Sequence, residues 1–170
     1  QATAKYLENG LLKFIPPNRI FSQITNCKVG KQNFDAYANR DSLGYIEPYG
    51  IGSAQTVIRG TLRRKGYCEA WNSLVKLGLT DDSYVLPHSQ SLTYRELVCA
   101  FLSGANNLNV ESKLAQFLGT TKSSKIFKKI VWLGLLEPIG IGLNNATPAQ
   151  ALQKLLQEKW KLTKMIWIKL

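Results

Sequence analysis

A run of cationic residues in the first half of the chain is the part of the sequence best suited to bind an anion. It reads Arg59-Gly60-Thr61-Leu62-Arg63-Arg64-Lys65-Gly66. Arginine offers a planar fork that can hold both oxygens of a carboxylate, and Gly60 lets a ligand or another backbone come near. Thr61 and Arg63 are two residues apart, so on a strand they point the same way at a spacing of about 7 Å. The run therefore predicts a carboxylate site, and the alternative is a salt-bridged strand edge.

A strand over residues 56–64 must present this run, because apolar and cationic positions alternate along it. Val57, Arg59, Thr61 and Arg63 fall on one face, and Ile58, Gly60 and Leu62 fall on the other. Upstream, residues 18–55 are rich in Asn, Gly, Ser and Tyr, which indicates short elements and loops around Asn39-Arg40-Asp41-Ser42. Loops of this kind often carry ligands.

The first fifteen residues predict a helix followed by a short strand. Residues 1–10 contain good helix formers and end at Asn9-Gly10, where glycine supplies a left-handed helix end. Residues 11–15 are typical of a strand, which Pro16-Pro17 would end because proline lacks the backbone N–H.

From Gly66 onward the apolar spacing becomes helical and predicts five helices. The first has a stripe from Tyr67 to Val75 and ends at Gly78. A capping box, Thr93-x-x-Glu96, begins the second, which Gly104 ends. The starting residues of the other three are Val110, the cap Ser124 and the Thr147-Pro148-Ala149-Gln150 box.

Strands, five helices and a final strand indicate an α+β fold, in which an α/β-type substrate domain is interrupted by a mostly helical insert. We place the substrate-domain part at residues 1–65, the insert at 66–160 and a returning strand at 161–170. Residues 163–170 are apolar on both faces, as in a central strand. We expect this strand to pair with absent sequence or with a second copy in a homodimer, and we interpret the chain as a piece of a longer protein.

Metal, hydrolase and dinucleotide chemistry are all predicted to be absent. Cys27, Cys68 and Cys99 lie far apart in the sequence, and His88 is the only histidine, so we expect no zinc site, disulfide framework or catalytic triad. Two glycine strings, at residues 50–52 and 140–142, do not complete GxGxxG. In each case a proline precedes the string where the buried strand of a dinucleotide site should run.

The net charge of +11 raises the question of an anionic partner. Between residues 120 and 170 there are nine lysines against two glutamates. These lysines lie on the polar sides of predicted helices, and no arginine or recognition signature accompanies them, so we interpret them as a solvated basic face. Apolar stretches fall short of the roughly 18 residues of a membrane span. We therefore expect neither a nucleic acid nor a membrane as a partner.

Five segments occur in a fixed order along the first half of the chain. They are Asn39-Arg40-Asp41-Ser42, Tyr49-Gly50-Ile51, Arg59-Gly60-Thr61-Leu62-Arg63, Lys65-Gly66-Tyr67 and Leu74-Val75-Lys76-Leu77-Gly78-Leu79. In order and spacing this set resembles the L-glutamate-forming saccharopine dehydrogenases (saccharopine reductases), including the C-terminal half of bifunctional aminoadipic semialdehyde synthases. The likeness extends weakly to both sides of this region and covers most of the chain.

The resemblance implies reversible hydride transfer between NAD(P) and saccharopine, which joins glutamate to a lysine skeleton and yields glutamate and aminoadipate semialdehyde. By position, it implies that Arg40, Thr61, Leu62 and Arg63 contact saccharopine, with no catalytic residue in this chain. Saccharopine bears three carboxylates, which suits arginine forks. Arg64 departs from the family pattern, where an aromatic residue is common.

The family architecture also implies a separate Rossmann domain that holds NAD(P), and this sequence lacks its fingerprint. We therefore expect no cofactor on this chain, which needs the missing Rossmann domain of the same polypeptide as a partner. The implied location is cytoplasmic, or mitochondrial if the parent is an animal bifunctional enzyme. The rival hypothesis is a non-catalytic basic module for nucleic acid or acidic membranes, whose binding would fall steeply with salt.

Overall fold

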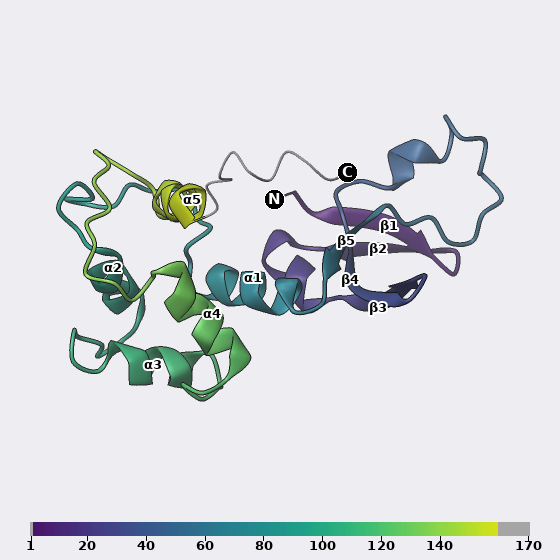
Figure 1. Ribbon diagram of the computed structural model, residues 1–170. Helices are drawn as coiled ribbons and strands as arrows, with labels where there is room; N and C mark the ends of the chain where they lie inside the picture. Colours follow the sequence, from purple (N-terminus) through teal and green to yellow (C-terminus); the bar gives the residue numbers. More distant parts are fainter. Residues whose placement is uncertain (1, 160–170) are drawn as a thin grey trace, which may run out of the picture. The chain divides into compact units, whose positions relative to one another are not determined.

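The structure is a computed structural model that describes residues 2–159. These residues form two compact units, one up to Asn72 and one from Ser73 onward. Strands and helices occur together, so the α+β class expected from the sequence is confirmed (Figure 1). The elements are, in chain order, β1 (Ala4–Glu8), β2 (Leu11–Ile15), η1 (Pro17–Ser22), β3 (Thr25–Val29), β4 (Gln32–Ala38), η2 (Leu43–Tyr45), β5 (Gly60–Arg64), α1 (Tyr67–Lys76), α2 (Tyr94–Phe101), α3 (Val110–Phe117), α4 (Lys125–Leu133) and α5 (Pro148–Lys159).

The first ten residues form a strand, so the helix predicted there is wrong. β1 pairs antiparallel with β2, and Glu8 lies opposite Leu11 across a two-residue turn. Asn9 and Gly10, with φ of 51° and 76°, occupy that turn. Asn-Gly with both residues left-handed matches the twist of a β-hairpin, so this dipeptide joins two strands instead of ending a helix. The strand predicted at residues 11–15 is confirmed as β2.

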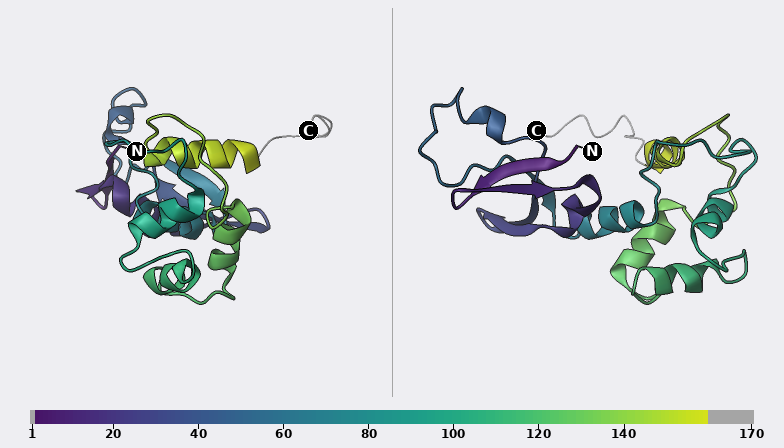
Figure 2. Two further views of the ribbon diagram at one scale, coloured as in Figure 1. Left: turned by 90° about the vertical axis from the view of Figure 1, so that its left-hand side faces the viewer. Right: turned by 180° about the vertical axis from the view of Figure 1, so that it is seen from behind.

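A three-stranded antiparallel sheet, in the order β3-β4-β5, carries the cationic run. β3 and β4 lie where the sequence indicated only short elements and loops, and Gly30 begins the turn between them in the left-handed region. β5 begins at Gly60, four residues later than predicted, because Val57 instead bridges to Leu7 of β1. A Cβ at Gly60 would lie 3.2 Å from the Tyr37 carbonyl oxygen, so this glycine permits close approach of β4. The right-hand view of Figure 2 shows the two hairpins from behind.

An aromatic cluster packs on one face of this sheet and forms much of the core of the first unit. The Phe21 ring, from η1, lies 4.9 Å from the Tyr37 ring of β4 and 6.1 Å from the Trp71 ring of α1. Phe21 and Tyr37 are buried. The first turns of α1 are therefore anchored to the strand pair that holds the cationic run.

The second unit is helical, and its helix starts are largely those that the sequence predicts. Thr93 and Glu96 form both halves of the capping box of α2, and the Ser124 hydroxyl accepts the Phe127 N–H at the start of α4. Thr147 and Gln150 exchange the same reciprocal bonds at the start of α5. α2 packs against α3 and α4 against α5. Fully buried leucines fill the core: Leu79, Leu97, Leu114 and Leu135.

The strand predicted at residues 163–170, with the homodimer based on it, lies outside the described residues. Over residues 2–159, none of the helices combines the length and apolar character needed to cross a bilayer.

Candidate carboxylate-binding site

β5 presents Thr61 and Arg63 on one face of the sheet. Thr61 lies opposite Tyr37 and Arg63 lies opposite Asp35 on β4. Because strand side chains alternate between faces, Leu62 and Arg64 point to the opposite face. The structure therefore brings together the side chains of Thr61 and Arg63, as the spacing predicts, and separates them from that of Leu62.

An aromatic ring supports the guanidinium of Arg63. Its central carbon lies 5.2 Å from the centroid of the Tyr67 ring, and Tyr67 stacks on Trp71 with 7° between the ring planes. Burial raises the pKa of the Tyr67 phenol above its ordinary value, and the nearby positive charge of Arg63 partly offsets this rise. A guanidinium held over a ring keeps the N–H groups at its edge available. Arg63 is exposed, and a hydrogen bond from its side chain also lowers the pKa of the Tyr67 phenol.

Arg59, Arg63 and Arg64 form no ion pair with a carboxylate within the described part of the chain. Arg95, by contrast, pairs with Glu111 at 3.8 Å. Asp35 lies opposite Arg63 but is buried, and its Oδ2 accepts the Gly66 N–H at 2.8 Å. The salt-bridged strand edge, which the sequence left open, is therefore not what residues 2–159 form.

Thr61 is tied to the end of β4 by a side-chain hydrogen bond. The Asn39 amide nitrogen Nδ2 donates to Thr61 Oγ1 at 3.0 Å, and the bond is partly buried. The backbone N–H of Asn39 donates to the carbonyl of Arg59 at 2.9 Å, which continues the strand pairing beyond Ala38. Asn39 is thus fixed by its backbone while its side chain faces Thr61.

Arg40 follows directly, and it forms neither a hydrogen bond nor an ion pair with Thr61 or Arg63. It has φ of 57°, and its carbonyl accepts the Lys5 N–H at 2.9 Å. This left-handed turn carries the chain from β4 to the edge of β1, where Asp41 pairs with the Lys5 ammonium at 3.8 Å. The Arg40 side chain is exposed, and among residues 2–159 it has no hydrogen-bond or ion-pair partner.

Cys68 lies beneath this surface in a fully buried position. Burial, reinforced by the negative charge of Asp35 and opposed by Arg63, raises the pKa of its thiol to about 11. The thiolate is the reactive form, so this cysteine is inert at neutral pH.

We expect Cys68 to resist thiol reagents in the folded chain. Because burial raises the pKa of this thiol from 9.0 to about 11, the thiolate fraction at pH 8 falls about 100-fold, and the buried position slows the reaction further. Labelling with 5,5′-dithiobis(2-nitrobenzoic acid), followed by peptide mapping, should show Cys68 modified only after unfolding in urea. A Cys68→Ser variant identifies its signal. Rapid modification of native Cys68 would contradict the buried position.

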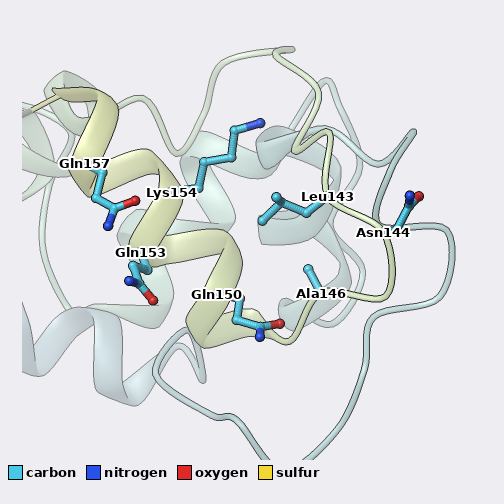
Figure 3. Close-up of a pocket in the computed structure, with 7 residues that line it drawn as sticks. All are labelled: Leu143, Asn144, Ala146, Gln150, Gln153, Lys154 and Gln157. Atoms are coloured by element: carbon cyan, nitrogen blue, oxygen red, sulfur yellow. The ribbon is translucent and has the colours of Figure 1, made fainter.

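A hollow of about 300 Å³ lies beside α5 and is a second candidate binding site (Figure 3). Two of the polar side chains that line it already have partners. Gln150 Oε1 accepts the Thr147 N–H, and the Lys154 ammonium donates to the Ile141 carbonyl at 2.6 Å and pairs with Glu158. Lys154, the cation that lines the hollow, is thus already paired, so the hollow suits a carboxylate less well than the face of β5 does.

The described residues contain neither a metal cluster nor a dinucleotide-binding turn. Nowhere in residues 2–159 do three His, Cys, Asp or Glu side chains gather at a site suited to a metal ion. Residues 50–52 lie in a loop after η2, and Gly140 bridges antiparallel to Thr93. A dinucleotide site needs a glycine turn between a parallel strand and a helix, so these strings do not fit NAD(P).

Sequence reasoning missed two residues of this site as functional positions. Asn39 bonds the Thr61 hydroxyl, and Tyr67 supports Arg63. Asn39 follows Asp35 and Tyr37 at intervals of two. Once β4 is recognised as a strand, this spacing places all three residues on the same face as Thr61 and Arg63. Tyr67 lies four residues after Arg63 across the strand-to-helix turn at Gly66, and no single periodicity spans such a turn.

Comparisons with known proteins agree on one family. The family model described as the saccharopine dehydrogenase C-terminal domain matches residues 1–166. The mitochondrial alpha-aminoadipic semialdehyde synthase of Rattus norvegicus is 41% identical over 108 residues, which are 61% of this chain and 12% of that protein. The NADP(+)-dependent, L-glutamate-forming saccharopine dehydrogenase of Schizosaccharomyces pombe is 29% identical over 142 residues, 78% of this chain and 32% of that protein.

A solved structure gives the same result. The apo saccharopine dehydrogenase (L-Glu forming) of Saccharomyces cerevisiae superposes with a TM-score of 0.75 at 25% identity, covering 92% of this chain and 36% of that one. The chain thus spans about a third or less of the proteins it is compared with here.

Proposed function

The chain belongs to the saccharopine dehydrogenase family, as its C-terminal domain, and from this premise we propose that it binds the carboxylates of saccharopine in an oxidoreductase of lysine metabolism. The observation that carries the proposal is the Thr61–Arg63 face of β5, where an exposed guanidinium held over Tyr67 has no carboxylate partner among residues 2–159. Bidentate pairing with an arginine suits each of the three carboxylates of saccharopine.

The four proposed contacts have different roles. Arg63 holds one carboxylate, and Thr61 donates its hydroxyl hydrogen to an oxygen beside it. Arg40 binds a second carboxylate, since its side chain is exposed and without a partner among the described residues. Leu62 contributes through its backbone, because its side chain points to the other face and β5 is an edge strand of its sheet.

The complete enzyme transfers a hydride between saccharopine and NAD(P), which supplies the hydride acceptor when bound. The described residues do not form a nucleotide site, so we place the cofactor on a Rossmann domain elsewhere in the polypeptide. Hydride transfer requires the reacting atoms within about 3–3.5 Å of each other. The residues of this chain contribute to that geometry by holding the substrate through its carboxylates, and the cofactor domain must place the nicotinamide.

The location depends on the parent protein. If the parent is a bifunctional enzyme, we propose a mitochondrial location, in line with the name of the rat relative. If the parent is monofunctional, we propose a cytoplasmic location.

The chain alone is expected to bind neither NAD nor NADP, because residues 2–159 lack a phosphate-binding turn between a parallel strand and a helix. Titration of each cofactor, followed by quenching of tryptophan fluorescence, measures this directly. A linear, non-saturating signal is expected. Saturable quenching in the micromolar range would contradict the assignment of the cofactor to another domain.

Ligand selectivity tests the proposed function itself. The chain should bind saccharopine at least about 10-fold more tightly than lysine, because lysine lacks two of the three carboxylates and each lost charged contact weakens binding by more than 1 kcal/mol. Titrations at 0.05 and 0.2 M salt separate this from nonspecific attraction to a basic protein. Equal affinities for the two ligands, or a preference for a phosphate polymer that disappears with salt, would favour the rival basic module.

A further inference from the structure

A hydroxyl group that accepts a hydrogen bond on its oxygen keeps its own hydrogen for a second partner. At Thr61 one of the two oxygen lone pairs is occupied, because Asn39 Nδ2 donates to Thr61 Oγ1 at 3.0 Å. The hydroxyl hydrogen is then free to point away from Asn39. A ligand beside Arg63 meets Thr61 as a hydrogen-bond donor, which a carboxylate requires because an ionised carboxylate only accepts.

The backbone holds Asn39 in this role. Its N–H donates to the Arg59 carbonyl at 2.9 Å, which joins the end of β4 to the residue before β5. Ser42 Oγ accepts the Arg59 N–H at 2.9 Å, so both backbone groups of Arg59 are bonded in this junction. Asn39 is half-buried, and water therefore competes less for its amide than at an exposed site.

We propose that Asn39 is a positioning residue that sets the Thr61 hydroxyl as a donor to a substrate carboxylate bound by Arg63. This inference rests on the proposed function, and it adds a residue to the site that neither the sequence motif nor the resemblance assigns. Asn39 itself does not touch the substrate. Its effect on affinity passes through the hydroxyl of Thr61.

The proposal predicts non-additive effects of two substitutions. Asn39→Ala should weaken the binding of saccharopine about 5-fold, as expected for a lost neutral hydrogen bond, and Thr61→Val should weaken it about 10-fold. In the Thr61→Val background, Asn39→Ala should change affinity less than about 2-fold, because the hydroxyl through which it acts is gone. Titration of the 170-residue chain with saccharopine gives the four dissociation constants.

A second variant is expected to reverse the direction in which the Thr61 O–H points. Asn39→Asp has nearly the same shape but only accepts hydrogen bonds, so it draws the Thr61 hydrogen toward itself and presents lone pairs to the carboxylate. We expect a larger loss than for Asn39→Ala. In the Thr61→Val background, Asn39→Asp measures the loss of affinity caused by the added negative charge alone. Any larger loss in the wild-type background is then due to the reversed Thr61 hydroxyl.

The outcomes separate this inference from the proposed function. If Arg63→Ala and Thr61→Val weaken binding but Asn39→Ala does not, or if Asn39→Ala costs the same in both backgrounds, the positioning role is wrong and the proposed function stands. If none of the three changes affinity, the proposed function fails. Thermal melts of every variant check folding, and Asn39→Ser, which keeps a small polar side chain, replaces Asn39→Ala if the latter does not fold.

Discussion

Replacing Arg63 with alanine is expected to reduce kcat/KM for saccharopine by about 30-fold to several hundred-fold in the complete enzyme. This corresponds to about 2–4 kcal/mol, the range for removing one partner of a desolvated charge pair. The size follows from the position of Arg63, whose guanidinium is already held over the Tyr67 ring, so little ordering of this side chain remains to be done on binding. Steady-state kinetics on saccharopine measures the effect.

The neighbouring arginine is the matched control. Arg64 has the same charge and lies on the same strand, but it pairs with Phe34 on the opposite face of the sheet. Arg64→Ala should cost under about 1 kcal/mol, the usual value of an exposed charge. Arg40→Ala should resemble Arg63→Ala. Equal losses at positions 63 and 64, or no loss at 40, would show that the assignment of individual residues is wrong even though the family is right.

Replacing Phe21 with alanine is expected to destabilise the first unit by about 3–5 kcal/mol, the usual cost of truncating a buried phenylalanine. Phe21 is 4% exposed, and its ring contacts those of Tyr37, Tyr67 and Trp71. The loss would also loosen Tyr67, and with it the support of Arg63. Amide hydrogen exchange at β4 and α1 reports the stability of this unit separately from the helical one.

An exposed phenylalanine provides the comparison. Phe14 on β2 is 59% exposed, so Phe14→Ala should change stability by less than about 0.5 kcal/mol. If Phe21→Ala does not fold, Phe21→Leu, with an expected cost of about 1–2 kcal/mol, keeps the comparison measurable. Equal protection factors in the Phe21 and Phe14 variants would mean that the aromatic cluster does not support the site.

The helical unit could be predicted from the sequence because its signals are local. A capping box is complete within four residues, so Thr93 and Glu96 mark the start of α2 without any knowledge of the rest of the chain. The left-handed glycine at position 78 after α1 is equally local.

The strands were harder because their pairing partners are distant or their signals ambiguous. Asn9-Gly10 is a helix end in one context and a hairpin turn in another, and pairing with β2 decides between them. β4 has only weak alternation, because Asp35 is a buried polar residue that serves the Gly66 N–H. Its register with β5 could not be derived from the sequence.

At the candidate site, the shared face of Thr61 and Arg63 followed from the period of a strand alone. Asn39 and Tyr67 did not, because each reaches its partner across a change of element: Asn39 across the loop between β4 and β5, and Tyr67 across the turn into α1. The proposed role of Arg40 follows from the family resemblance, and the structure adds that its carbonyl accepts the Lys5 N–H at the edge of β1.

Titration of the uniformly ¹⁵N-labelled chain with saccharopine, followed by NMR, tests the central claim most directly. The account predicts saturable shifts at the Arg63 side-chain Nε–H, the Thr61 amide and the Asn39 side-chain amide, with a second response at Arg40. The Arg64 side chain and the hollow beside α5 should not respond. Saturable shifts confined to the hollow or to the lysines of the helical unit, or no saturable shift at β5, would contradict carboxylate binding at this site.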